Sequence, residues 1–176
     1  MASATSRTRR DRFAALDALV SRPANASRRV LIACSSGGHL AQAMTLEPWW
    51  TGVERLWVTF DTPDAVSLLE AESTVWCYRP TTRNVPNLIR NLWLAWKVMR
   101  HYRPDMVLST GAAIAFPFFV LAKLSRVATC YVEVYDRIST RTLTGRLCRP
   151  LSDLFLVQWP EQVGLYRDAQ LIGTLL

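Results

Sequence analysis

The stretch from Arg29 to Leu40 reads RVLIACSSGGHL. It starts as a short apolar run and passes through four small residues, two of them glycine, into a helical pattern. A buried strand that turns at once into a helix is typical of the first unit of a parallel sheet covered by helices. Adjacent glycines also let backbone N–H groups approach a ligand, and a helix start favours anions. The stretch therefore predicts both a fold and an anion-binding turn.

The same alternation of apolar runs and helical stretches continues to the end of the chain. It predicts one Rossmann-like, doubly wound α/β domain with a parallel sheet over residues 29–176. The predicted strands are Val30–Cys34, Arg55–Thr59, Thr74–Tyr78, Met106–Ser109, Thr129–Val134, Leu154–Val157 and Gln170–Ile172. The helices between them are predicted to begin near Leu40, Pro63, Val85, Ala113 and Thr140.

The length of 176 residues suits one such domain and is too short for two. Residues 1–28 are rich in Ser, Ala and Arg and are predicted to be a basic, disordered tail. The alternative is a weakly amphipathic segment that touches anionic lipid. No apolar segment reaches the length of a membrane-spanning helix, so we expect a cytoplasmic protein that attaches to a membrane only peripherally.

The formal net charge of +7 indicates an anionic partner. Nearly all of the basic residues are arginine, which suits phosphate recognition, and we expect a phosphorylated substrate and a lipid surface rather than nucleic acid. The four cysteines form no Cys-x-x-Cys pair and no zinc-type spacing with the two histidines. We therefore expect reduced cysteines, no metal site and no cofactor.

In sheets of this kind the ligand binds beyond the carboxyl ends of the strands. Small residues follow the first strand at Ser36, Gly37 and Gly38, and the fourth strand at Thr110, Gly111 and Ala112. Two open corners of this kind can enclose a phosphate or diphosphate. His39, at the same edge, is a candidate general base or phosphate ligand. The alternative is that these residues serve only tight turns and close packing of helix on sheet.

Charged residues follow the fifth predicted strand. Glu133 is a second candidate base, and Asp136 with Arg137 are candidate contacts to sugar hydroxyls. The alternative is a loop that is held by its own ion pairs.

The segment Asn87–Tyr102 combines Trp and Leu with cationic residues, as helices at a membrane surface do. The apolar run Ala115–Leu124 is predicted to add a second exposed patch. The alternative for both is packing in the core. The predicted membrane contacts are Leu92, Trp93, Trp96, Lys97, Arg100, Phe118 and Phe119.

Five blocks of this sequence, taken in order, resemble a known family. The family comprises the membrane-associated subunit of the heterodimeric UDP-N-acetylglucosamine transferase of dolichol-linked oligosaccharide synthesis, together with bacterial relatives in exopolysaccharide and capsule assembly. The resemblance covers about residues 29–176, and the bacterial branch is the nearer one because no N-terminal membrane anchor is seen. The blocks are SGGHL at Ser36–Leu40, STGA at Ser109–Ala112 with Pro117, EVYDR at Glu133–Arg137 with Ser139, LTGRL at Leu143–Leu147, and DLFLVQWP at Asp153–Pro160 with the closing Gly173.

The resemblance implies half of a GT-B glycosyltransferase, equivalent to the N-terminal, acceptor-binding domain. A small donor-binding glycosyltransferase subunit would hold the UDP-sugar, and this chain would be inactive without it. The acceptor would be a polyprenyl-diphosphate-linked sugar at the inner leaflet of the cytoplasmic membrane, with its diphosphate on the two small-residue corners and His39 or Glu133 as the base. The product would serve exopolysaccharide or capsule biosynthesis.

Two other functions remain open on the sequence. A dinucleotide-binding oxidoreductase would use Asp61, after the second strand, to bind ribose, although the Gly-x-Gly-x-x-Gly pattern is absent. A non-catalytic membrane scaffold would only recruit and activate the donor-binding partner.

Overall fold

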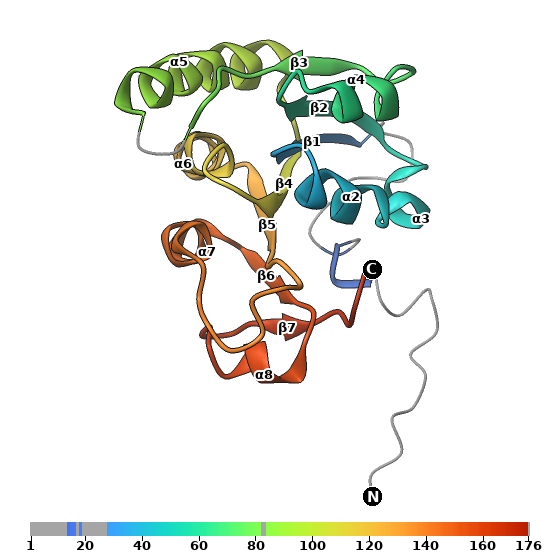
Figure 1. Cartoon of the computed structure of the whole chain (residues 1–176), viewed down its shortest axis with the longest axis vertical. Coiled ribbons are helices and arrows are strands. Elements are labelled where there is room, and N and C mark those ends of the chain that lie inside the picture. Colours follow the sequence, from blue (N-terminus) through green and yellow to red (C-terminus); the bar gives the residue numbers. More distant parts are fainter. Residues whose placement is uncertain (1–13, 17, 19–27, 82–83, 176) are drawn as a thin grey trace, which may run out of the picture.

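The computed structural model describes residues 14–16, 18, 28–81 and 84–175. Its centre is a seven-stranded sheet in the order β3-β2-β1-β4-β5-β6-β7, with every neighbouring pair parallel (Figure 1). All of the predicted strands are present, with ends that differ by at most two residues. The strands are β1 Arg29–Cys34, β2 Glu54–Thr59, β3 Thr74–Trp76, β4 Met106–Gly111, β5 Ala128–Val132, β6 Leu154–Val157 and β7 Gln170–Leu171.

The helices follow the predicted order, with short additions. The longest, α5, starts where the Asn84 side chain accepts a hydrogen bond from the Asn87 N–H at 2.9 Å, and it ends at Arg103 in the left-handed conformation. Among the described residues no helix is both long and apolar enough to cross a membrane. The helices are α2 Gly38–Met44, α3 Glu47–Trp50, α4 Pro63–Leu68, α5 Val85–Tyr102, α6 Ala115–Leu124, α7 Leu143–Cys148, the 3₁₀ helix η1 Arg149–Leu151 and α8 Pro160–Val163.

Both faces of the sheet are buried because side chains alternate along each strand. On β1, Val30 and Ile32 belong to the cluster that packs with α2, α3 and α4. Leu31 and Ala33 belong to the opposite cluster, which packs with α5 and α6. All four cysteines are free and buried, and burial raises the pKa of the Cys34 thiol to about 12.

The predicted tail, residues 1–28, lies mostly outside the described residues. One described residue there, Leu16, is fully buried in the cluster beneath α2 and α3. The domain boundary at residue 28 stays a prediction.

The strand order reverses between β1 and β4, which are neighbours in the middle of the sheet. From this point α2 leaves toward one face of the sheet and α6 toward the other (Figure 1). Such a reversal is where open α/β sheets bind ligands, at the carboxyl ends of the two strands. The turns after β1 and β4 are therefore the first place to look for a site.

Candidate functional site

The turn after β1 presents open backbone. Gly37 has φ 71°, in the left-handed region, and a Cβ built on Gly37 or Gly38 would meet no atom within 4 Å. The Gly37 N–H donates to the Asp64 carboxylate, at the start of α4, at 3.0 Å. The Thr62 hydroxyl and this N–H lower the pKa of Asp64. A negatively charged oxygen thus already sits on the turn, as expected of an anion-binding loop.

The turn after β4 has an unusual backbone conformation. Gly111 has φ 118° and Ala112 has φ 72°, so two successive residues lie in the left-handed region. That conformation is rarely populated by a residue with a side chain, and such strain is concentrated at functional sites. The Ser109 hydroxyl oxygen accepts the Gly111 N–H at 3.0 Å and holds the turn.

His39 joins the two turns. Its Nδ1 lies 2.8 Å from the Thr110 carbonyl oxygen, and the Thr110 hydroxyl donates to the His39 carbonyl oxygen at 2.6 Å. A carbonyl only accepts, so Nδ1 carries the proton and the lone pair of the neutral ring is on Nε2. The ring packs against Gly111, where an added Cβ would lie 2.7 Å from His39 Cε1. The structure thus brings together the predicted residues of both corners.

Glu133 lies at the same edge of the sheet but is fully buried. Its carboxylate accepts hydrogen bonds from the Val134 N–H at 3.0 Å, from the Thr142 hydroxyl at 3.0 Å and from the Tyr166 hydroxyl. Burial raises its pKa, and these hydrogen bonds partly offset that rise. The carboxylate therefore ties the start of α7 to the segment before β7 and already accepts from three donors. Thr142 and Tyr166 were not predicted as site residues.

Asp136 and Arg137 lie in an exposed loop after β5. Within the described part of the chain neither forms an ion pair, so the loop is not held in the way the alternative interpretation required. Instead the Gln162 amide donates to the Val134 carbonyl at 2.8 Å and to the Arg137 carbonyl at 3.2 Å. Both charged side chains are free to meet a ligand at the edge of the sheet.

One side of α5 is apolar and exposed. Lys97 Nζ lies 3.3 Å from the ring centre of Trp93, and the Arg100 guanidinium lies 5.9 Å from that of Trp96. Cations next to exposed Trp rings are the arrangement expected at the depth of lipid head groups. The exposed apolar residues recur at helical spacing, at Val85, Leu88, Ile89, Leu92, Trp93 and Trp96; we call them the α5 stripe.

The prediction that Phe118 and Phe119 contact a membrane is wrong. Both side chains are 0% exposed. Helix α6 lies between α5 and α7 and packs on β4 and β5, so neighbours cover it on several sides. Phe119 meets Tyr131 of β5 edge to face, with ring centres 5.9 Å apart.

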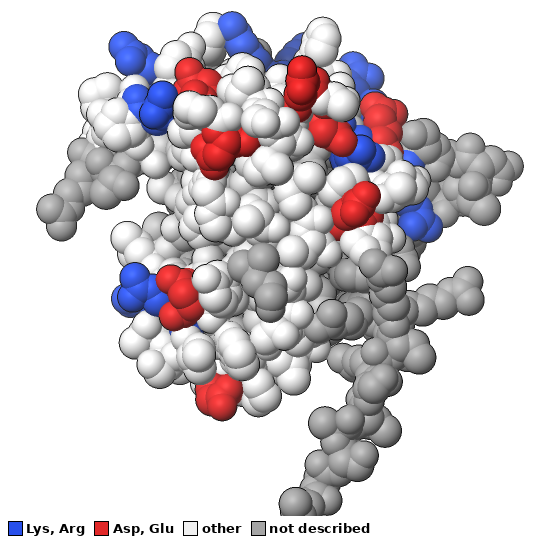
Figure 2. Space-filling view, turned by 45° about the vertical axis from the view of Figure 1, so that its right-hand side comes forward, with Lys and Arg blue, Asp and Glu red and all other residues white. Residues whose placement is uncertain are grey.

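Charges on the part of the molecule around β2, β3 and α4 are mixed in sign. Figure 2 shows acidic and basic side chains next to one another over the upper part of its view, and no continuous basic surface on that face. One such pair joins Asp61 to Arg79, with Nε and Oδ1 2.9 Å apart. Asp61 is the acid that a dinucleotide-binding enzyme would need, and here it is engaged by a cation.

Comparisons with known proteins identify the family of the chain and its fold. Residues 78–175 match the family described as "Oligosaccharide biosynthesis protein Alg14 like". The mouse protein "UDP-N-acetylglucosamine transferase subunit ALG14" is 32% identical over 49% of this chain and 42% of its own length, so the matched part spans less than half of that relative. A transferase of Syntrophotalea carbinolica, whose name includes "pyrophosphoryl-undecaprenol N-acetylglucosamine transferase", is 29% identical over 52% of this chain and 25% of its own length.

A solved structure with the same fold is MurG of Acinetobacter baumannii, which has a TM-score of 0.63 and 16% sequence identity. The likeness covers 76% of this chain and 42% of that one. It confirms the predicted fold class, the Rossmann-like architecture found in GT-B glycosyltransferases. Because the family match covers more than half of the sequence, the chain belongs to the Alg14-like family of oligosaccharide biosynthesis proteins.

Proposed function

We propose that this chain is the acceptor-side subunit of a two-subunit inverting glycosyltransferase. It would extend a polyprenyl-diphosphate-linked sugar from a UDP-sugar, which the mouse relative's name suggests is UDP-N-acetylglucosamine. The observation that carries the proposal is the pair of hydrogen bonds by which His39 links the turn after β1 to the turn after β4. The bacterial relative, whose name pairs a diphosphate-linked polyprenol with sugar transfer, supports the choice of acceptor.

The acceptor diphosphate would lie along the two turns. Backbone N–H groups of Gly37 and Gly38, the Ser36 hydroxyl and the turn Thr110–Ala112 would face its oxygens. Asp64 now occupies the Gly37 N–H and is exposed, so its carboxylate can leave when a phosphate binds. The exchange replaces one anion with another on the same donor.

His39 would remove the proton from the acceptor hydroxyl through Nε2. The freed oxygen then attacks the anomeric carbon of the donor as the bond to the UDP leaving group breaks, which inverts that carbon. The Thr110 carbonyl, which already accepts from Nδ1–H, would stabilise the imidazolium that results. A positioned general base contributes about 10² to 10⁴ in rate.

Glu133 was the other predicted base, and we infer a positioning role for it. Its carboxylate is buried and receives three hydrogen bonds, and it holds the segment that follows the exposed loop of Asp136 and Arg137. That loop would meet the acceptor sugar. Because the Glu133 side chain is 0% exposed, the carboxylate holds the segment in place without meeting the substrate.

Binding of the donor sugar and access to the lipid-linked acceptor would require a partner subunit and a membrane. A small donor-binding subunit would face the same edge of the sheet and hold the UDP-sugar for in-line attack. The α5 stripe would lie on the inner leaflet and bring the edge of the sheet that carries the turns after β1 and β4, which we call the crevice, to the lipid-linked acceptor. The chain would then lie at the cytoplasmic face of the membrane. Exopolysaccharide or capsule synthesis is the process that we assign to the product.

The test is transfer from a panel of labelled UDP-sugars to polyprenyl-diphosphate-linked acceptors in membranes. It compares this chain alone, its candidate partner alone and both together. Transfer that needs both chains supports the proposal and names the donor. Full transfer by the partner alone would reduce this chain to a scaffold, and no transfer in any arm would contradict the proposal.

A further inference from the structure

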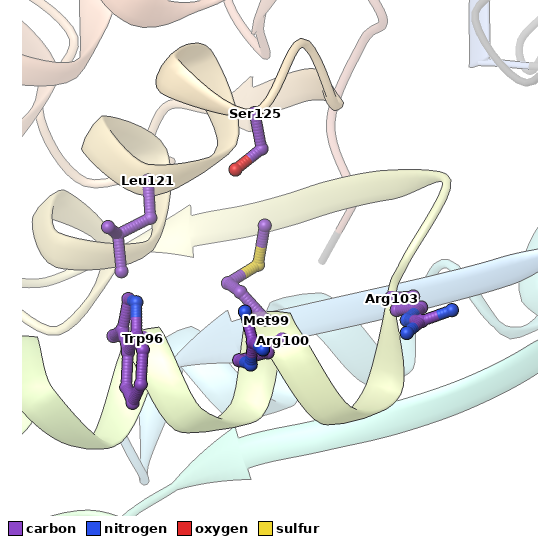
Figure 3. Close-up of a pocket in the computed structure, with 6 residues that line it drawn as sticks. All are labelled: Trp96, Met99, Arg100, Arg103, Leu121 and Ser125. Atoms are coloured by element: carbon purple, nitrogen blue, oxygen red, sulfur yellow. The ribbon is translucent and has the colours of Figure 1, made fainter.

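A pocket of about 330 Å³ lies between the C-terminal ends of α5 and α6, away from the crevice (Figure 3). Three lining residues are apolar, namely Trp96, Met99 and Leu121, and in Figure 3 Trp96 and Leu121 approach each other from the two helices. The other three are Arg100, Arg103 and Ser125. The pocket thus offers cations and a hydroxyl next to an apolar wall.

The pocket cannot share a ligand head group with the crevice. Helix α6 starts just after the turn of Gly111 and Ala112, and its last residues border the pocket. Its ten residues separate the two places by about 15 Å. A phosphate in the pocket would therefore belong to a different molecule from the acceptor diphosphate.

The cations of the pocket are available to an outside anion. Among the described residues neither Arg100 nor Arg103 is paired with a carboxylate, and no acidic side chain lines the pocket. Arginine at a helix C-terminus is favoured by the helix dipole, which accounts for one such residue in the last turn. Arg100 and Arg103 both line the hollow, and a guanidinium group is suited to binding a phosphate through several donors.

The pocket adjoins the α5 stripe, because Trp96 belongs to both. If the stripe lies on a bilayer, the mouth of the pocket is at the depth of the head groups, where phosphate is anionic and the first methylene groups are apolar. We propose that the pocket binds the head group of an anionic phospholipid that is not the substrate, with its phosphate between Arg100 and Arg103 and the Ser125 hydroxyl donating to it. The inference rests on the membrane contact in the proposed function. A head group bound in this pocket would fix the rotation of α5 on the membrane surface. It would therefore also set the direction in which the crevice faces.

The test is co-sedimentation of the full chain with vesicles of phosphatidylcholine alone and with vesicles that also contain phosphatidylglycerol. We expect binding to both, with a clear preference for phosphatidylglycerol. The double variant Arg100→Gln/Arg103→Gln should lower affinity for the anionic vesicles about 30-fold, since each arginine near such a surface is worth about 1 kcal/mol. The control Arg146→Gln/Arg167→Gln removes the same number of positive charges from exposed positions around α7 and before β7, where both residues line a separate hollow. An equal loss in the control would overturn the pocket and leave only general electrostatic attraction.

A second variant separates the pocket from its charge. Ser125→Trp fills the hollow and keeps both arginines, so we expect the preference for phosphatidylglycerol to disappear while binding to phosphatidylcholine persists. A retained preference in this variant would overturn the proposal. Absence of wild-type binding to either vesicle would contradict the membrane contact itself, whereas equal wild-type binding to both would contradict the pocket alone.

The source of the phosphate is tested by nuclear magnetic resonance of the arginine Nε–H groups. Short-chain phosphatidylglycerol should shift the signals of Arg100 and Arg103, while short-chain phosphatidylcholine and inorganic phosphate should shift them much less. Equal shifts with inorganic phosphate would assign the pocket to a free anion. Shifts with an acidic peptide and none with lipid would assign it to a protein partner, and either result would overturn the phospholipid.

Discussion

Two corners at the same edge of the sheet carry the two predicted bases, and they differ in access. At the corner of β1 and β4, His39 is half-buried beside open glycine backbone, with one ring nitrogen tied to Thr110. At the corner of β5 and β6, Glu133 is fully buried and its carboxylate is covered by Thr142 and Tyr166.

The difference teaches that a polar residue after a strand is not enough to make a catalytic group. Whether such a residue can reach a ligand depends on how the chain after the strand covers it. After β1 two glycines leave the edge open, whereas after β5 the chain returns over the edge and closes it with hydroxyl groups. The open corner can do chemistry on a ligand, and the closed corner holds the segment in place.

The largest expected effect on stability is at the closed corner. Glu133→Ala leaves the Thr142 and Tyr166 hydroxyls and the Val134 N–H without their buried acceptor, so we expect a loss of about 3 kcal/mol in the free energy of unfolding. Urea denaturation measures it. The control Asp136→Ala, in the exposed loop nearby, should stay within about 0.5 kcal/mol of wild type. Similar losses for the two variants would show that the corner is not closed.

A smaller loss is expected at Gly145, in α7. An added Cβ would lie 2.1 Å from Glu133 Oε2 and 2.7 Å from the Tyr166 hydroxyl. Gly145→Ala should therefore destabilise the chain by about 2 kcal/mol, although alanine normally favours a helix. Gly164→Ala is the matched control, because its nearest neighbour is 3.9 Å away. It should be neutral or slightly stabilising, and an unchanged Gly145→Ala would contradict the packing.

At the open corner, Gly111→Ala should cost about 2 kcal/mol of stability, because the φ of 118° disfavours a side chain and the new Cβ would press on the His39 ring. Its effect on sugar transfer should be larger, because the new Cβ meets the His39 ring and moves it off Thr110. Misplacement by about 1 Å lowers turnover by about 10²-fold. Gly52→Ala, whose Cβ would be in open space, controls for the added methyl group. Full transfer by Gly111→Ala would mean that the position of His39 does not matter.

The smallest expected effect is the pH dependence of stability that Glu133 contributes at the closed corner. Because the folded-state pKa of Glu133 is raised, its contribution is fully present below the ordinary value of 4.5 and is lost as the pH rises through the raised pKa. Unfolding of wild type and Glu133→Gln across that range should show wild type losing stability relative to the variant as the pH increases. Parallel curves would indicate that Glu133 titrates normally.

Much of the fold could be predicted because each strand is a short apolar run that ends in turn residues. The short helices α3 and α8 were missed, since four residues are too few to show a period. The predicted corners of Gly37 and Gly111 come together because parallel strands place their carboxyl ends at one edge.

The burial of side chains was harder to predict. Glu133 is covered by Thr142 and Tyr166, which are nine and 33 residues away along the chain, so no local pattern reveals the cover. The apolar helices α5 and α6 were expected to behave alike, but α5 has several charges among its apolar residues, whereas α6 has Lys123 alone, in its last turn. Phe118 and Phe119 lie in an uninterrupted apolar run, and a helix that is apolar all round is typically buried.

The most direct test of the central claim is sugar transfer by the assembled two-chain complex that carries His39→Ala. The account predicts a fall of about 10² to 10⁴ in turnover, with assembly, vesicle binding and stability close to wild type. His101→Ala, the other histidine and at the far end of α5, should leave turnover unchanged. Undiminished transfer by an assembled His39→Ala complex would contradict the claim and leave the chain as a scaffold for its partner.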